Sequence, residues 1–231
     1  MELTERQSQI LNEIIEEYIN SAKPVSSKLL EKKHNFKVSP ATIRIEMQKL
    51  DDSGFISQPH TSAGRIPTDK GYRFYVDNFL NEEFFQDKDQ AIDELINREA
   101  NDTIKLLQSI TKNLASFSSS LAMGYLSNEK ILLKEGWEDV VREPEFKETD
   151  FISHFAEAIK NFEEEIGEMK LSREVEVFIG KENPFPKAKE FSLIITRFWF
   201  PGDEGFLAIV GPKRMTYEKN INYLKLLISK L

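Results

Sequence analysis

Apolar residues in the first fifty positions recur three and four residues apart, which is the spacing of amphipathic helices. Thr4 and Gln7 form a capping box before one such helix, and Ser26 can cap a second, shorter one. A third helix is predicted to begin at Ser39-Pro40, because serine caps helices and proline is tolerated at the first helical position. Three short helices are therefore predicted.

The third predicted helix has two unlike faces. Ile43, Met47 and Leu50 lie at i, i+4 and i+7 and so share an inward face. The opposite face is small, polar or cationic, and a polar turn between two short apolar runs then predicts a hairpin, followed by a further helix capped at Thr68 or Asp69. A helix-turn-helix pattern with such a hairpin is typical of a winged helix domain. We expect this domain over residues 1–80.

The next amphipathic stretch carries a short heptad seam. Its apolar residues are spaced 3, 4, 3 and 4 apart: Leu107, Ile110, Leu114, Phe117 and Leu121. Two interpretations fit, namely self-association through this seam or a helix lying on its own domain. We assign dimerisation to the seam and expect residues 81–127 to form a helical linker.

The C-terminal part mixes helical and strand patterns. An amphipathic helix is predicted from Phe151 to Ile166, and residues 174–179 alternate as a half-buried strand. Two apolar runs, 191–200 and 205–210, are joined by a turn at Pro201-Gly202-Asp203-Glu204 before a closing helix. Residues 128–231 are thus predicted to form a small α+β domain, which makes the whole chain α+β.

Composition narrows the class of protein. The 231 residues include 40% apolar residues, enough for a sizeable core, and no cysteine, which excludes disulfides and thiolate sites. No apolar run is long enough to span a membrane, and the N-terminus lacks the apolar stretch of a signal peptide. We expect a soluble cytoplasmic protein.

Positive charge is concentrated in one segment. The chain carries a net charge of −8, yet residues 21–75 hold ten Lys/Arg against five Asp/Glu. This distribution favours binding of double-stranded DNA by the predicted winged domain. The candidate DNA-binding residues are Ser39, Ala41, Thr42, Arg44, Ile45, Gln48, Lys49, His60, Thr61, Ser62, Gly64 and Arg65. The alternative is an ordinary capped helix and a solvated loop.

The sequence predicts no enzyme, cofactor or metal site. Phosphate-binding and nucleophile motifs are absent, and the three histidines lie far apart without partners at i+3 or i+4. Residues 211–214, Gly-Pro-Lys-Arg, could take an anion at a helix start, although such basic loops are more often simply exposed.

The residues from Gln58 to Asp77, QPHTSAGRIPTDKGYRFYVD, closely resemble the wing and following helix of the HrcA family of bacterial heat-inducible transcription repressors. Ser39 to Leu50 resembles the family's recognition helix. Three C-terminal segments, 144–146, 179–182 and 211–217, resemble further family signatures.

This resemblance implies a repressor of chaperone operons that binds an inverted-repeat operator, the CIRCE element, as a homodimer. It also implies regulation by the GroE chaperonin and a GAF-like fold for the C-terminal domain. The alternative is a winged-helix regulator that senses a ligand, or a protein- or RNA-binding module unconnected with heat shock.

The chain departs from the family pattern in two ways. Arg44-Ile45 stands where the family usually has Arg-Asn, so an amide is replaced by an apolar side chain. Family members are also about a hundred residues longer. Part of the GAF-like domain and the inserted dimerisation domain are therefore expected to be missing here.

Overall fold

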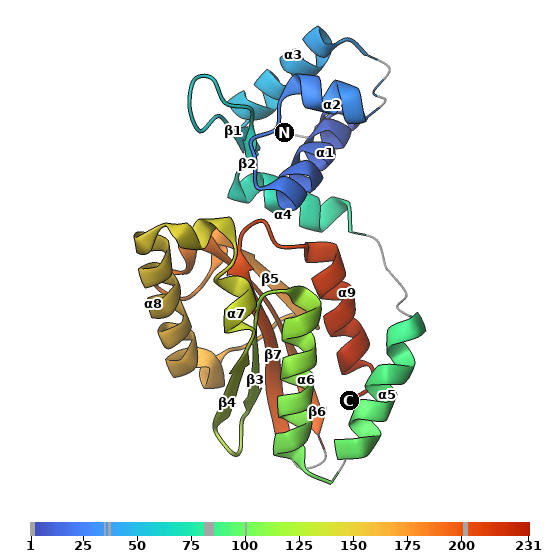
Figure 1. Cartoon of the computed structure of the whole chain (residues 1–231), viewed down its shortest axis with the longest axis vertical. Helices are drawn as coiled ribbons and strands as arrows, with labels where there is room; N and C mark the ends of the chain where they lie inside the picture. The colour runs from blue at the N-terminus through green and yellow to red at the C-terminus, as the bar shows by residue number, and fades with distance from the viewer. Residues whose placement is uncertain (1–2, 35, 37, 81–85, 100, 201–202) are drawn as a thin grey trace. The chain divides into compact units, whose positions relative to one another are not determined.

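The computed structural model describes residues 3–34, 36, 38–80, 86–99, 101–200 and 203–231 (Figure 1). Its contacts divide the chain into an N-terminal unit, residues 1–80, and a C-terminal unit, residues 81–231. The first five residues of the predicted linker, 81–85, and the first half of the predicted turn, 201–202, lie outside the described residues. The second half of that turn, 203–204, is already strand. Among the described residues, no helix is both long and apolar enough to cross a membrane.

The N-terminal unit consists of short helices and one small hairpin. Its elements are α1 (Glu5–Ser21), α2 (Ser27–Lys33), α3 (Pro40–Asp52), β1 (Ile56–Ser57), β2 (Ile66–Pro67) and α4 (Asp69–Asn78). The predicted caps are confirmed: Thr4 and Gln7 form a capping box, Ser26 accepts from the Leu29 N–H, and Ser39 accepts from the Thr42 N–H. The local sequence therefore fixes where these helices begin.

The hairpin is tied to the segment between α1 and α2. Val25 and Arg65 exchange two backbone hydrogen bonds, each 2.8 Å long. A Cβ on Gly64 would lie 2.4 Å from the Val25 carbonyl oxygen, so only glycine allows this approach. The base of the hairpin is thus anchored to the body of the unit.

The C-terminal unit is built on a five-stranded antiparallel sheet in the order β4-β3-β7-β6-β5. Its strands are β3 (Leu121–Leu126), β4 (Ile131–Glu135), β5 (Val175–Ile179), β6 (Phe191–Phe200) and β7 (Asp203–Pro212). Its α-helices are α5 (Gln86–Glu99), α6 (Thr103–Ser118), α7 (Trp137–Val140), α8 (Thr149–Glu165) and α9 (Tyr217–Ile228). Single 3-10 turns are η1 (Pro144–Lys147), η2 (Ile166–Glu168), η3 (Gly180–Glu182) and η4 (Ala188–Glu190).

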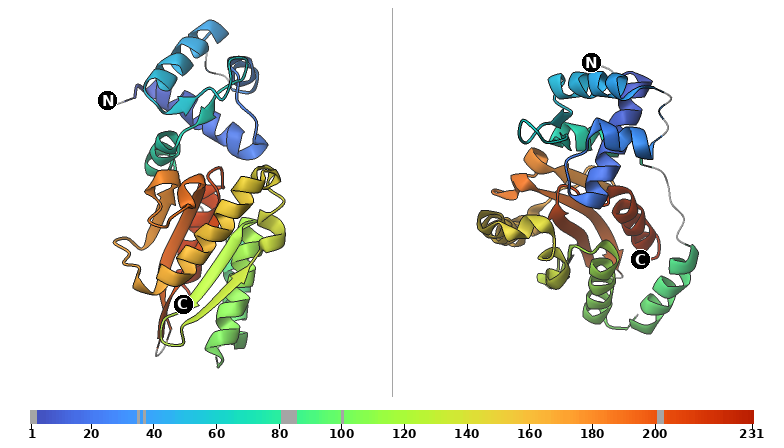
Figure 2. Two further views of the ribbon diagram at one scale, coloured as in Figure 1. Left: turned by 90° about the vertical axis from the view of Figure 1, so that its left-hand side faces the viewer. Right: turned by 45° about the horizontal axis from the view of Figure 1, so that its top comes forward.

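Helices cover both faces of this sheet (Figure 2). On one face, α8 and the 3-10 turns enclose a core rich in phenylalanine, in which Phe155, Phe162 and Phe191 are almost fully buried. On the other face, α6 packs so closely that a Cβ on Gly124 would lie 2.3 Å from the Thr111 hydroxyl. The predicted α+β class is confirmed.

The prediction of a helical linker over residues 81–127 is wrong. The helix that carries the seam ends at Ser118, before the last seam residue, Leu121. Ser119 takes a left-handed conformation (φ 52°) that turns the chain into β3. Residues 103–126 supply a helix and a central strand of the C-terminal unit, and the predicted boundary at 127/128 falls inside the paired β3–β4 hairpin. A strand buried on both faces has no alternation, so its apolar run was indistinguishable from helix.

The apolar seam is covered within its own unit. Leu107, Ile110 and Leu114 on α6 are fully buried, and Leu121 is fully buried in β3. Phe117 stacks on Tyr223 of α9, with ring centroids 3.6 Å apart, and burial raises the pKa of Tyr223 to about 12. The expectation that the seam is covered by a second copy is therefore corrected. Leu107, Ile110, Leu114 and Leu121 form the interior of the helix–sheet packing, and the half-buried Phe117 packs on α9.

Candidate nucleic-acid interface

Helix α3 presents the two faces predicted for it. Ile43, Met47 and Leu50 are buried against the unit's interior. Glu46 is also buried and accepts hydrogen bonds from Gln7 Nε2 at 3.0 Å and Lys49 Nζ at 3.1 Å. Burial alone would raise the pKa of Glu46, but the hydrogen bonds from Lys49 and Gln7 outweigh it and lower the pKa. Lys49 therefore already has an ion-pair partner, Glu46, on its own helix.

The opposite face of α3 is exposed at Ala41, Arg44, Ile45 and Gln48. Within the described part of the chain, no carboxylate pairs with Arg44, and its side chain is exposed, so its donors are available to an outside partner. Ser39 and Thr42 have a local role, since the Ser39 hydroxyl accepts from the Thr42 N–H at 3.2 Å and lies 3.1 Å from the Thr42 hydroxyl. They shape the start of the helix beneath the exposed face.

The C-terminal half of α3 is acidic and internally paired. Asp51 Oδ2 lies 2.8 Å from Arg65 Nε, an ion pair in which the Nε–H makes no aligned hydrogen bond. Gln48 donates to Asp52 at 2.8 Å and accepts from Arg65 Nη2 at 3.4 Å. Carboxylates repel phosphates, so the N-terminal half of α3, with Ala41, Arg44 and Ile45, is the part suited to an anionic polymer.

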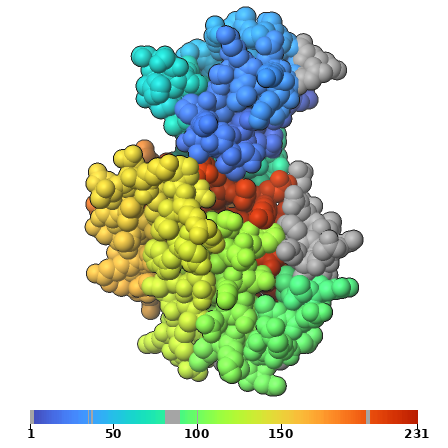
Figure 3. All heavy atoms as spheres, viewed as in Figure 1, coloured from blue at the N-terminus to red at the C-terminus, as the bar shows by residue number. Residues whose placement is uncertain are grey.

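The hairpin turn projects from the unit and is visible at its edge in Figure 3. His60, Thr61 and Ser62 are exposed at its tip. Gln58 closes the turn by donating to the carbonyl oxygens of Thr61 and Ala63, both at 3.0 Å. The tip therefore offers hydroxyl and imidazole groups on a loop of fixed shape.

Gly64 and Arg65, two of the candidate DNA-binding residues, do not lie at the hairpin tip. Gly64 packs against Val25, and the Arg65 side chain turns back to α3, leaving 15% of it exposed. The sequence alone could not show this, because Asp51 and Arg65 meet only when the hairpin folds over α3. In the chain without DNA, the ion pair between Arg65 and Asp51 therefore links the hairpin to α3.

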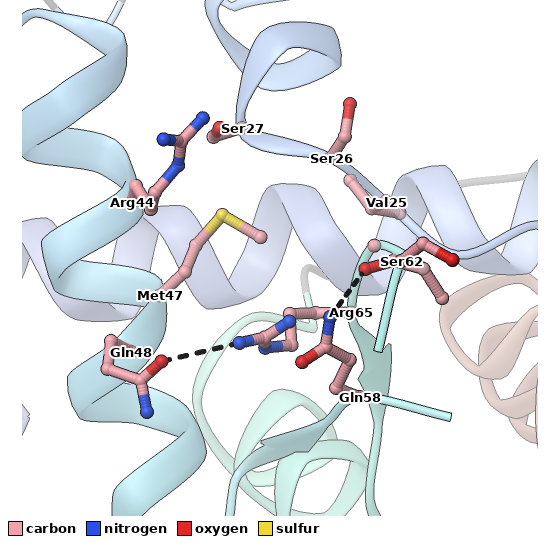
Figure 4. A pocket seen from close by; sticks show the side chains of 11 residues that line it. Val25, Ser26, Ser27, Arg44, Met47, Gln48, Gln58, Ser62 and Arg65 are labelled. Carbon is pink, nitrogen blue, oxygen red and sulfur yellow. Dashed lines mark hydrogen bonds between the residues drawn. The ribbon is translucent and has the colours of Figure 1, made fainter. Parts of the chain in front are cut away.

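A groove of about 320 Å³ separates α3 from the hairpin (Figure 4). Arg44 and Gln48 line one wall, Ser62 and Arg65 the hairpin side, and the start of α2 contributes Ser26 and Ser27. Guanidinium and hydroxyl groups converging on one concave surface suit a phosphate backbone. Three polar lining residues, Ser26, Ser27 and Gln58, were not among the predicted binding residues, although Ser26 was recognised as a helix cap.

The remaining candidates for chemistry are occupied by internal partners. His34 lies between two carboxylates, 2.7 Å from Glu13 and 3.3 Å from Glu17. In the described residues, no group of three histidine or carboxylate side chains could hold a metal ion. Arg214, in the basic loop that could have taken an anion, is bonded to Glu143 and Glu145 of its own unit.

The fold is that of an α+β chain in which a small helical unit with an exposed helix face and hairpin precedes a sheet covered by helices on both sides. Residues 73–221 match the family model described as HrcA protein C terminal domain, which is more than half of the chain, so the chain belongs to the HrcA family.

Similar proteins agree with this assignment. The heat-inducible transcription repressor HrcA of Alkaliphilus metalliredigens is 48% identical over 121 residues, which are 52% of this chain and 35% of that protein. The protein of the same name from Acetivibrio thermocellus is 40% identical over 131 residues, or 37% of its length. These matches thus span just over a third of the relatives' lengths.

A longer alignment covers the whole chain. The heat-inducible transcription repressor HrcA of Thermoanaerobacter sp. is 26% identical over 332 positions, which include all of this chain and 96% of that protein. The alignment exceeds the 231 residues of this chain, as expected for a shortened member. The crystal structure of a hypothetical protein shares the fold, with a TM-score of 0.77, 20% identity and full coverage of both chains.

Proposed function

We propose that this protein is a sequence-specific transcription repressor of heat-inducible chaperone operons, and not an enzyme. In this proposal residues 1–80 are a winged helix-turn-helix domain that binds double-stranded DNA, and the C-terminal unit is a shortened GAF-like domain. One observation carries the proposal: α3 exposes Arg44, which no carboxylate of the described residues neutralises, and small or apolar side chains beside an anchored hairpin, in a member of the HrcA family. The relatives reported above are named as repressors.

The proposed binding mode follows from the shape of this surface. The N-terminal half of α3 enters the major groove, where Arg44 can donate two hydrogen bonds to a guanine edge. The groove beside it, lined by Ser26, Ser62 and Arg65, receives the phosphate backbone. The exposed turn at 60–62 lies over the neighbouring minor groove or backbone.

The proposal includes the binding of two copies of this chain to one operator. An inverted-repeat operator presents two half-sites related by a two-fold axis, and one winged domain fills one of them. Because the α6 seam is buried, the contact between copies must use another surface. The family resemblance adds control by the GroE chaperonin, which would keep the repressor folded until heat-damaged proteins compete for it.

Operator selection from random duplex DNA tests the proposal, with binding then measured between 50 and 200 mM salt. A single inverted repeat should be enriched, and the affinity for it should fall steeply as the salt concentration rises. A salt range of about this width is enough to measure the slope of affinity against salt. Arg44→Ala should weaken operator binding by about 1–3 kcal/mol and relax preference at one base pair. Arg142→Ala, which removes an arginine whose side chain is 78% exposed in the C-terminal unit, is the matched control and should leave binding unchanged.

Failure to enrich any duplex would refute the DNA-binding role, and preference for single-stranded RNA would favour the alternative module. Sedimentation of the protein–operator complex counts the copies bound, and one copy on a full repeat would contradict the dimer. Chaperonin control is tested by refolding the denatured protein with and without GroE and ATP, with operator binding as the readout. Equal recovery in both would remove the chaperonin from the proposal.

A further inference from the structure

Ile45 occupies an unusual position for a large apolar side chain. It is 57% exposed and is the only large hydrophobic residue exposed to this degree in the described part of the N-terminal unit. It lies on the outward side of α3, since the inward side is defined by the buried Ile43, Met47 and Leu50. More than half of its surface is left uncovered by the described part of the unit.

Folding does not account for an isoleucine here. A β-branched residue forms helix less readily than the polar residues usual at exposed positions, and its apolar surface stays in water. Ala41 lies one helical turn before Ile45 and is also exposed, so the two form a short apolar strip. Arg44 and Gln48 border this strip on the side of the groove. The strip gains stability only when a partner covers it.

The chemistry of the DNA major groove supplies one apolar partner. Among the four bases, only thymine places a methyl group there, at C5. The small side chain of Ala41 leaves room for a base edge to approach Ile45 closely. A site for guanine at Arg44 and a site for a methyl group at Ile45 would read different base pairs, since adjacent helical residues point about 100° apart.

We propose that Ile45, supported by Ala41, contacts the C5-methyl group of a thymine, so that the operator requires a T·A pair at that position of each half-site. This inference rests on the proposed function and adds to it the identity of one base pair. The contact is apolar, so its strength does not depend on salt, unlike phosphate contacts.

The experiment removes the methyl group from the DNA and the side chain from the protein separately. Each thymine of the selected operator is replaced singly by deoxyuridine, which lacks only the methyl group. Dissociation constants are measured for the wild type and for Ile45→Ala, in which alanine preserves the helix. Ile104→Ala, at a 42% exposed isoleucine of α6, is the matched control.

At one position per half-site, deoxyuridine should weaken wild-type binding about fourfold, the factor equivalent to one buried CH₂ group of about 0.8 kcal/mol. Ile45→Ala should bind thymine and deoxyuridine at that position equally, whereas Ile104→Ala should behave as the wild type. Ile45→Asn should shift the preferred base at the same position toward adenine, because an amide can pair with its N6 and N7 groups.

Two results would overturn the inference while leaving the proposed function intact. One is selective operator binding by the wild type that no deoxyuridine substitution weakens. The other is equal sensitivity to deoxyuridine in the wild type and Ile45→Ala, which would assign the methyl contact to another side chain. Absence of selective duplex binding, in contrast, would refute the proposed function itself.

Discussion

Arg214 and Glu145, 69 residues apart in sequence, form a two-pronged ion pair: Arg214 Nε lies 2.6 Å from Glu145 Oε1, and Nη2 lies 2.9 Å from Oε2. Glu143 accepts from the same Nη2. The pair joins η1 to the connection between β7 and α9, and only 11% of the Arg214 side chain is exposed. Burial opposes the charged form of Arg214, but its hydrogen bonds to Glu145 and Glu143 outweigh this effect and raise the pKa of the guanidinium.

Removing this arginine should destabilise the C-terminal unit. Arg214→Ala leaves two partly buried carboxylates without their donor and should lower the free energy of unfolding by about 2–3 kcal/mol. Arg214→Lys should recover less than half of the loss, because an ammonium group cannot form both parallel bonds. Both tryptophans, Trp137 and Trp199, lie in this unit, so fluorescence during urea unfolding reports on it alone. The exposed Arg142→Ala serves as control, and a full rescue by lysine would contradict the two-pronged role.

Asp51 should restrain DNA binding. Asp51→Asn removes the carboxylate that neutralises Arg65, which frees one cation for a phosphate. Affinity for duplex DNA should rise, and the slope of log K against log salt should steepen by about one unit. Asp52→Asn removes the same charge one residue away without touching the Arg65 ion pair, so it corrects for general repulsion. Equal effects of the two substitutions would show that Arg65 stays bound to α3 in the complex.

Substitutions of buried residues on the inner face of α6 should destabilise the C-terminal unit itself, and not only prevent two copies of the chain from associating. Leu114→Ala is expected to cost about 2–5 kcal/mol, as for other buried leucines, and Ile110→Glu more, because the carboxylate has no partner there. Ile104→Glu, on the exposed side of the same helix, should change stability by less than about 0.5 kcal/mol. Tryptophan fluorescence in urea measures each variant. A folded Ile110→Glu monomer would restore the seam as a dimer contact.

The N-terminal unit should lose stability in acid partly through Glu46. Its pKa is lower in the folded chain than in the unfolded chain, so its stabilising effect is complete above the ordinary glutamate value of about 4.3. As pH falls below that value, the unfolded chain takes up a proton first, and the free energy of unfolding decreases. Glu46→Gln should flatten this part of the pH profile, whereas Glu31→Gln, at an exposed position, should not. Circular dichroism during denaturation at several pH values provides the measurement.

The sequence was informative where local chemistry decides the structure. Ser39 and Pro40 fix the start of α3, and the spacing of Ile43, Met47 and Leu50 fixes which side faces inward, so the exposed face could be predicted residue by residue. β3 could not be predicted, because both of its faces are covered and its apolar residues therefore show no alternation.

The ion-pair partners of the predicted binding residues could not be predicted from the local sequence either. Lys49 and Arg65 look like free cations in the sequence, yet each is held by a carboxylate, Glu46 and Asp51 respectively. Whether a cation is available to DNA depends on which carboxylates the tertiary fold brings beside it. Arg44 was identified from its position on the helix and has no such neighbour among the described residues.

The anchored base of the hairpin has a consequence for how this surface can change over generations. Because Gly64 and the Val25–Arg65 hydrogen bonds hold the base, substitutions at 60–62 alter the outer loop without moving α3. In the proposed binding mode, total affinity for the duplex and choice of bases are then separately adjustable traits, encoded in different short stretches of the gene. Lineages could strengthen or loosen attachment to the same operator while keeping its sequence constant.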